Sequence, residues 1–155
     1  MQIDRFERIF MAISAVFIVI ALGALTASVT VGHVHLPQPA GRIDPAKVRQ
    51  TPPFDKPGLS KKANGDYQLV LVAQAWQWTP QKVTVPVGST VQIEATSIDV
   101  THGIRIPGTN ANVMVVPGQI SQISVPFKHS GQYTLLCHEF CGIGHQGMYM
   151  TINVR

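Results

Sequence analysis

Sulfur and imidazole side chains gather near the C-terminal end of this 155-residue chain. The segment from Cys137 to Met148 contains both cysteines of the protein, because Cys141 follows Cys137 after three residues. His145 and Met148 come next, after three and two intervening residues. Soft sulfur and borderline nitrogen donors suit copper or zinc better than calcium or magnesium. The spacing therefore predicts a transition-metal site.

Each of these residues also has a purely structural interpretation. Two cysteines in a domain exported across a membrane commonly form a disulfide, although a bridge over three residues closes a short loop and stabilises little. Met148 is in phase with Met150 and Ile152, which by itself indicates a core residue, and His145 lies in a glycine-containing loop. The combined spacing favours a metal, and the disulfide remains the alternative.

The metal site needs a second imidazole from elsewhere in the chain. A mononuclear type-1 copper site uses one Cys, two His and a weak axial Met, whereas this segment offers two thiols and one suitably placed His. His102 follows a polar turn at residues 96–99 and begins an apolar run, where a remote ligand can meet the C-terminal loop. His102 is favoured, and the candidates left open are His33, His35, His129 and His138.

Short strands are expected to position these residues. From Tyr67 onward, apolar and polar residues alternate in short runs that Gly, Pro, Asn or Ser interrupt. The alternating runs occupy residues 83–87, 91–95, 121–127, 133–137 and 148–154, and residues 67–73 form an apolar, β-branched run before them. Period-two alternation with turns every ~8–12 residues indicates an all-β sandwich or Greek-key barrel.

The N-terminal segment, residues 1–32, has a different character. Between Arg8 and His33 lie 24 residues without a charged side chain, and 12 of them are Ile, Leu, Val or Phe. At ~1.5 Å per residue this run forms a helix of about 36 Å, enough to cross a hydrocarbon layer of roughly 30 Å. We expect a retained transmembrane anchor. A cleaved signal peptide is the alternative, although its apolar part usually has only ~7–15 residues.

The segment at residues 33–66 contains six prolines and three glycines without any periodic pattern, and predicts an extended linker. Six of the 12 Lys and Arg residues lie between positions 42 and 62, whereas four basic and three acidic side chains nearly cancel from Tyr67 onward. The basic segment has only Phe54 as an aromatic residue, so it lacks a stacking platform for nucleic acid. We expect no nucleic-acid partner.

Several segments resemble the dinuclear copper domain of cytochrome c oxidase subunit II. They are Gln74-Ala75-Trp76-Gln77-Trp78, Asp99-Val100-Thr101-His102-Gly103, Gly108 to Val113, Val116-Pro117-Gly118 and Cys137 to Met148. The single N-terminal helix is similar to that of the short subunit II in B-type haem–copper oxidases. The resemblance implies a cupredoxin-like Greek-key domain at residues 67–155, following the anchor and the linker.

The resemblance also implies a set of metal ligands. The thiolates of Cys137 and Cys141 would bridge two copper ions, which together form the CuA centre. His102 and His145 would each bind one copper through a ring nitrogen. The thioether of Met148 would be a weak axial ligand to one copper, and the backbone carbonyl of Glu139 would bind the other. The side chain of Glu139 is expected to reach a magnesium ion or a proton-exit region at the interface with oxidase subunit I. Asp99 is expected to orient a ligand or to help donor docking, or simply to form a turn.

The implied activity is electron transfer in a respiratory terminal oxidase. Electrons from a cytochrome c-like donor would enter at Trp76 and continue to the haem-containing subunit I, where oxygen is reduced to water. Without the resemblance, Trp76 is as well explained as a half-buried strand aromatic. The implied location is a prokaryotic cell membrane, crossed once, with the copper domain on the outer (periplasmic) side.

Three other functions fit part of the pattern. A membrane-tethered mononuclear cupredoxin would need only one thiolate, so Cys141 argues against it. Nitrous oxide reductase has a similar copper domain but carries a large second domain, which these 155 residues do not contain. A metal-free, disulfide-bonded β-sandwich that acts as a binding or assembly module would use Cys137 and Cys141 structurally.

The nearly neutral charge from Tyr67 onward predicts donor docking that depends weakly on salt. We expect the rate of electron transfer from the cytochrome donor to change little between low and moderate ionic strength. Electrostatic steering would instead supply ~10–10³-fold at low salt. A steep fall in the rate as salt is added would contradict this prediction.

Overall fold

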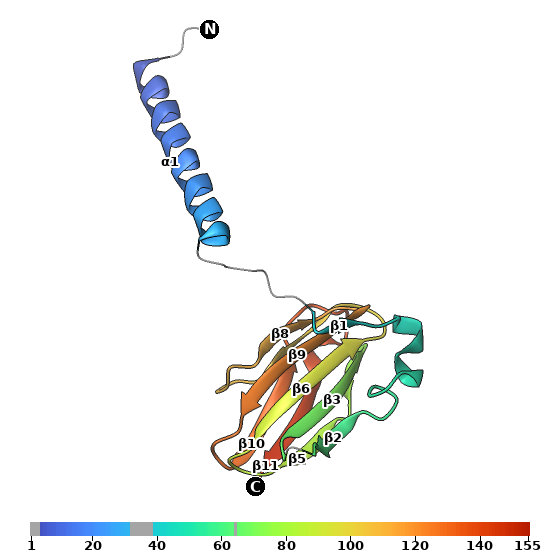
Figure 1. The fold of residues 1–155 in the computed structure, drawn as a ribbon. Coiled ribbons are helices and arrows are strands. Elements are labelled where there is room, and N and C mark those ends of the chain that lie inside the picture. Colours follow the sequence, from blue (N-terminus) through green and yellow to red (C-terminus); the bar gives the residue numbers. More distant parts are fainter. Residues whose placement is uncertain (1–3, 32–38, 64) are drawn as a thin grey trace. The chain divides into compact units, whose positions relative to one another are not determined.

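The computed structural model describes residues 4–31, 39–63 and 65–155. The chain divides into two compact units, one up to Gln38 and the other from Pro39 to Arg155. A single long helix is the described element of the first unit, and two β-sheets make up most of the second (Figure 1).

Helix α1 (Arg5–Thr30) has the length and composition of a membrane span. Asp4 caps it by accepting a hydrogen bond from the Phe6 amide, while the Glu7 carboxylate accepts one from the Asp4 amide. Its mean hydropathy reaches 2.6, and none of its residues is buried within the described structure. A helix that is apolar on all sides requires an apolar environment, which agrees with the expected anchor.

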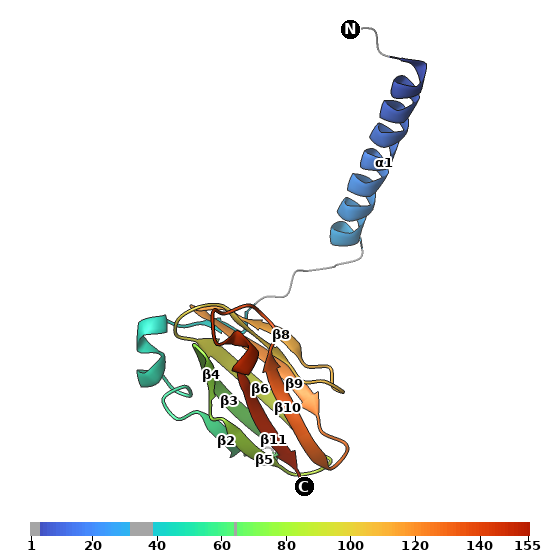
Figure 2. The same cartoon turned by 180° about the vertical axis from the view of Figure 1, so that it is seen from behind.

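The second unit is a sandwich of two sheets (Figures 1 and 2). The first sheet has the order β1 (Gly41–Arg42), β9 (Gln119–Pro126), β6 (Thr90–Ser97), β3 (Tyr67–Gln74) and β2 (Gly58–Lys61), with β4 (Gln77–Thr79) also paired to β3. The second has the order β5 (Lys82–Val85), β11 (Tyr149–Val154), β10 (Gly131–Cys137), β7 (His102–Arg105) and β8 (Asn112–Val115). The β3–β6 and β5–β11 pairs are parallel, and the other pairs are antiparallel.

Alternating side chains of the strands fill the space between the sheets. Leu69 and Leu71 of β3 meet Leu135 of β10 and Met150 and Ile152 of β11 in one buried cluster. Strands β10 and β11 lie in runs of period-two alternation and β3 lies in the apolar, β-branched run, so the predicted all-β sandwich is confirmed. The two- to four-residue strands β1, β2, β4 and β8 were not predicted, because so few residues carry no readable period.

Strand β3 is buried on both of its faces. Val70 and Val72 point away from the main core and pack against Ile43, Val48 and Phe54 in a second apolar cluster. Val48 belongs to the 3-10 helix η1 (Pro45–Gln50), whereas Ile43 directly follows β1 and Phe54 lies in the turn after η1. We call residues 39–61 the strap. The expectation of an extended linker is therefore wrong for these residues, because their apolar side chains are buried against β3. The sequence did not reveal this burial, since these apolar residues are isolated and follow no period.

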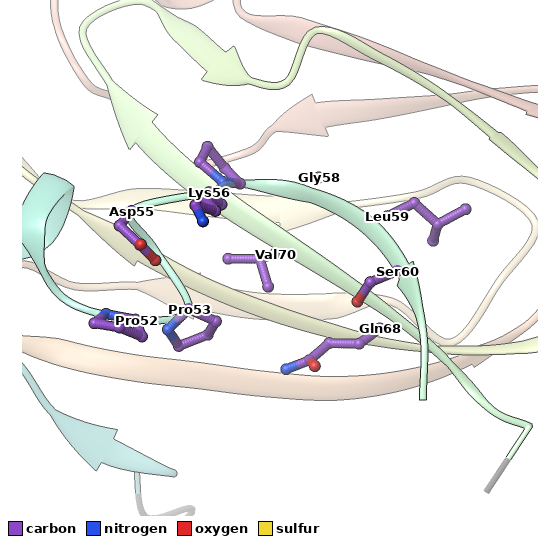
Figure 3. A pocket seen from close by; sticks show the side chains of 10 residues that line it. Pro52, Pro53, Asp55, Lys56, Gly58, Leu59, Ser60, Gln68 and Val70 are labelled. Carbon is purple, nitrogen blue, oxygen red and sulfur yellow. The ribbon is translucent and has the colours of Figure 1, made fainter. Parts of the chain in front are cut away.

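A hollow of about 490 Å³ lies where the strap passes over β3 (Figure 3). Val70 of β3 lies between the loop that carries Pro52 and Pro53 and strand β2, where Leu59 and Ser60 are found. The hollow shows that the strap covers the sheet only in part. None of its lining residues belongs to the cysteine-containing segment.

Replacing Val48 by Ala tests whether the strap is part of the folded unit. Val48 is fully buried, so removing two carbon atoms should lower the free energy of unfolding by about 2 kcal/mol. The measurement is chemical denaturation of the full chain in detergent. The matched control is Val87→Ala, at a half-exposed valine, which should change stability by less than ~0.5 kcal/mol. Equal, small effects at both positions would show that the strap behaves as a linker.

Candidate metal centre

Strand ends and one loop bring the predicted ligands together at one end of the sandwich. Cys137 is the last residue of β10 and His102 the first of β7, and β10 pairs with β7 through Cys137 and Ile104. The loop after β10 contains Cys141 and then the 3-10 helix η2 (His145–Gly147). It closes at Met148, whose carbonyl accepts a hydrogen bond from the Cys137 amide at 3.1 Å.

The two thiols form the centre of this cluster. The Sγ atoms of Cys137 and Cys141 are 3.8 Å apart, and both residues are free cysteines. A disulfide bond would require about 2.05 Å. His102 Nδ1 lies 3.8 Å from the Cys137 sulfur, and His145 Nδ1 lies 3.5 Å from the Cys141 sulfur. Each thiol therefore has its own imidazole.

Two weaker donors complete the cluster. The backbone carbonyl of Glu139 is 3.3 Å from the Cys137 sulfur, and the thioether sulfur of Met148 is 3.7 Å from the Cys141 sulfur. His102, both cysteines and Met148 are buried, and His145 is half-buried. Two thiols, two imidazoles and a thioether in a buried site suit copper, and within the described part of the chain the cluster holds no carboxylate of the kind that calcium or magnesium sites use. The donor set therefore fits copper.

Asp99 fixes the orientation of the His102 ring. Its carboxylate lies 3.0 Å from His102 Nε2, which must donate because a carboxylate accepts. Nδ1 is then left as the lone-pair nitrogen that faces the sulfur, as in many metal-bound histidines. Burial acts to raise the pKa of Asp99, but hydrogen bonds from the Ala75 amide, from His102 and from the Val100 amide outweigh it, so the pKa lies below its ordinary value.

Aromatic rings pack against both imidazoles. The buried ring of Trp78 lies 6.1 Å from that of His102, and the exposed ring of Phe140 lies 5.8 Å from that of His145. Sequence reasoning did not assign a role to Trp78, although its place in the motif with Trp76 was the available signal. Trp76 is 42% exposed, and its Nε1 donates to the Cys141 carbonyl at 3.0 Å.

The other candidate histidines have different surroundings. His129 and His138 are exposed. The His138 ring lies against the backbone of Gly103, and neither residue joins the cluster of His102, Cys137 and Cys141 found among the described residues. His33 and His35 lie outside the described residues. Among the candidates whose positions are described, His102 is the one that reaches the cysteines.

The surroundings of Cys141 favour its neutral thiol when no metal is bound. Burial first, and then the hydrogen bond and charge of the neighbouring Cys137, raise the pKa of Cys141 to about 11. The thiolate is the form that binds metal. Metal binding must therefore displace a proton from this sulfur at neutral pH.

Alkylation of the metal-free full chain by iodoacetamide tests the protonation of Cys141. Because the thiolate is the reactive form, the rate at Cys141 should be low at pH 8 and should keep rising towards pH 11. In denaturant the same thiol should react with a midpoint near pH ~8.5. Mass spectrometry of the modified peptides separates the two cysteines. A midpoint near 8.5 for Cys141 in the folded chain would contradict the prediction.

Comparisons with known proteins agree on one family. Residues 65–155 match the family described as "Cytochrome C oxidase subunit II, periplasmic domain". "Cytochrome c oxidase subunit 2" of Thermus thermophilus is 38% identical over 150 residues, which cover 93% of this chain and 87% of the relative. A chain in the cryo-EM structure of a haem–copper terminal oxidase dimer matches with a TM-score of 0.62 and 29% identity, covering 97% of this chain and 100% of that one.

A further structure supports the fold alone. The periplasmic domain of subunit II of the Bradyrhizobium japonicum cytochrome oxidase matches with a TM-score of 0.53 and 19% identity, over 57% of this chain and 83% of that domain. The all-β domain is thus cupredoxin-like, as the resemblance implied. With the family match over residues 65–155, these findings show that the chain belongs to the cytochrome c oxidase subunit II family, the electron-accepting subunits of haem–copper oxidases.

Proposed function

We propose that this chain takes electrons from a cytochrome c-like donor into a dinuclear copper centre and passes them to a haem-containing subunit I. The observation that carries this proposal is the pair of thiols 3.8 Å apart, each with its own imidazole within 3.8 Å. Oxygen reduction would then take place in the partner subunit, and this chain would perform electron transfer only.

The residues would divide the ligand roles as follows. Both thiolates would bridge two copper ions, and each imidazole would bind one of them. The thioether of Met148 and the backbone carbonyl of Glu139 would act as weaker ligands beside them. Support comes from the short distances of these two groups to the cysteine sulfurs, 3.7 Å and 3.3 Å.

Two metals explain the two thiols better than one. A mononuclear site needs a single thiolate, so the second buried thiol would stay protonated and would have no role as a ligand. Two cations compensate both negative charges in the same small volume. The bound copper would supply a one-electron redox couple, and the described ligand set leaves no evident open position for a substrate, by the logic that separates closed from open metal sites.

The protein part of the mechanism is rigidity and exclusion of water. Cys137 and His102 lie on paired strands of one sheet, and the Cys137 amide is tied to Met148 at the other end of the loop. Asp99 holds the His102 ring from behind. Ligands held in this way keep their positions when the charge of the site changes, so little reorganisation accompanies each transfer.

The donor would meet the surface around Trp76. Val100 lies just before His102, and Phe140 and Ile143 lie between Cys137 and His145; all three have exposed apolar side chains. They would offer a surface for a donor with an apolar haem edge.

The half-buried Glu139 would contribute its side chain to a magnesium contact at the interface with subunit I. The domain from residue 67 onward would lie on the outer side of a prokaryotic cell membrane, with residues 1–32 as the tail and anchor.

The metal content and the electronic state of the full chain test the proposal. Loaded with copper in detergent, the chain should bind two copper ions per molecule, and EPR should show one unpaired electron shared between them. His102→Ala should abolish the shared signal, because it removes one of the two imidazoles. The matched control is His129→Ala, at an exposed histidine outside the cluster, which should leave the signal unchanged.

The alternatives give different results in the same experiment. One copper with the spectrum of a blue mononuclear site would indicate a tethered electron carrier instead. No copper together with no free thiols would indicate a disulfide-bonded binding module. Either result in the unmodified chain would overturn the proposed function.

A further inference from the structure

The indole of Trp76 is bound to the cysteine loop although its other side faces solvent. Trp76 lies in the short connection between β3, which ends at Gln74, and β4, which begins at Gln77. Its Nε1 donates to the carbonyl of Cys141 at 3.0 Å. The ring therefore touches the backbone of a residue whose thiol belongs to the metal cluster.

Two glycines form the surface on which this ring lies. A Cβ atom added to Gly142 would come within 3.0 Å of Nε1 and 3.4–3.5 Å of Cζ2 and Cε2 of Trp76. A Cβ atom added to Gly144 would come within 2.6–2.7 Å of Cδ2, Cε3 and Cγ. Different atoms of the ring thus face each glycine, so the indole covers the backbone of both residues.

The contact at Gly144 is too close for any side chain. Distances below 3.0 Å to a Cβ atom essentially do not occur, so even a methyl group there would have to displace the indole or the loop. Gly144 has φ −92°, a conformation open to every residue, so the constraint at this position is steric alone. At Gly142 the φ of +115° adds backbone strain to the steric effect.

The connection between β3 and β4 that carries Trp76 also contacts Asp99, the residue that orients the His102 ring. The amide of Ala75 donates to Asp99 Oδ2 at 2.6 Å, and Asp99 Oδ1 accepts from His102 Nε2 at 3.0 Å. The connection between β3 and β4 therefore contacts the residue that orients His102 and also the loop that runs from Cys141 to His145. Both contacts fix the exposed indole relative to the two thiol–imidazole pairs.

We propose that Gly144 is a positioning residue for electron transfer from the donor, because its lack of a side chain lets the Trp76 indole lie directly on the loop between Cys141 and His145. This inference rests on the proposed function of the site and names the residue that holds its outer aromatic group in place. Gly144 acts through Trp76 and does not bind metal itself.

Replacing Gly144 by Ala tests the inference, with Gly147→Ala as the matched control. Gly147 lies in the same loop and also precedes a predicted ligand, but a Cβ atom there meets nothing within 4 Å. In the metal-free full chain, Gly144→Ala should increase the quenching of tryptophan fluorescence by acrylamide, because Trp76 leaves its contact. Trp78 stays buried in both variants, and Gly147→Ala should match the unmodified chain.

A second measurement uses the copper-loaded intact oxidase. Gly144→Ala should slow reduction by the cytochrome donor about tenfold or more, since displacement of a group by ~1 Å can cost up to ~10²-fold. The EPR signal of the copper site should stay unchanged in both variants. Equal quenching and equal donor rates in the two variants would overturn the inference. Loss of the copper signal in Gly144→Ala alone would also overturn it, since the glycine would then serve the ligands themselves.

A double variant covers the case in which Gly144→Ala fails to fold. In the background of Trp76→Ala the clash is absent, so adding Gly144→Ala should change neither stability nor donor rate. Failure of the double variant to regain the stability of Trp76→Ala would overturn the inference. The proposed function is tested separately, because it fails only when the unmodified chain lacks the shared copper signal.

Discussion

Two thiols held 3.8 Å apart in a buried site are the constraint on which the rest of this domain depends. Ionising both sulfurs without a partner would place two like charges side by side in a medium of low polarity. The raised pKa of Cys141 expresses this cost in the metal-free chain. Cations at the site remove the cost, so metal binding, loss of protons and the closeness of the two sulfurs are coupled.

Three sets of contacts hold the two thiols and their imidazoles in position: a strand pair, a hydrogen bond across the loop, and the connection between β3 and β4. The β10–β7 pair sets Cys137 beside His102, and the hydrogen bond between the Cys137 amide and the Met148 carbonyl closes the loop. The connection that carries Trp76 contacts both parts, through Asp99 on one side and the Cys141 carbonyl on the other. The exposed ring of Trp76 and the cluster of thiols and imidazoles are thus held by the same set of contacts.

Sequence reasoning succeeded where the residue pattern is local and regular. Alternation identified the long strands, and the spacing from Cys137 to Met148 identified the cluster. It failed where burial depends on distant partners. Val48 and Phe54 lie in a proline-rich segment without a period and become buried only because β3 offers a second apolar face. The contact between Gly144 and Trp76 joins residues far apart in the chain, so no local pattern could reveal it.

The most direct test of the proposal that two copper ions share both thiolates is X-ray absorption at the copper edge of the copper-loaded full chain. We expect two sulfur neighbours for each copper, together with nitrogen from imidazole and a second copper at short distance. A spectrum with a single sulfur neighbour and no nearby copper would contradict the bridging role of Cys137 and Cys141.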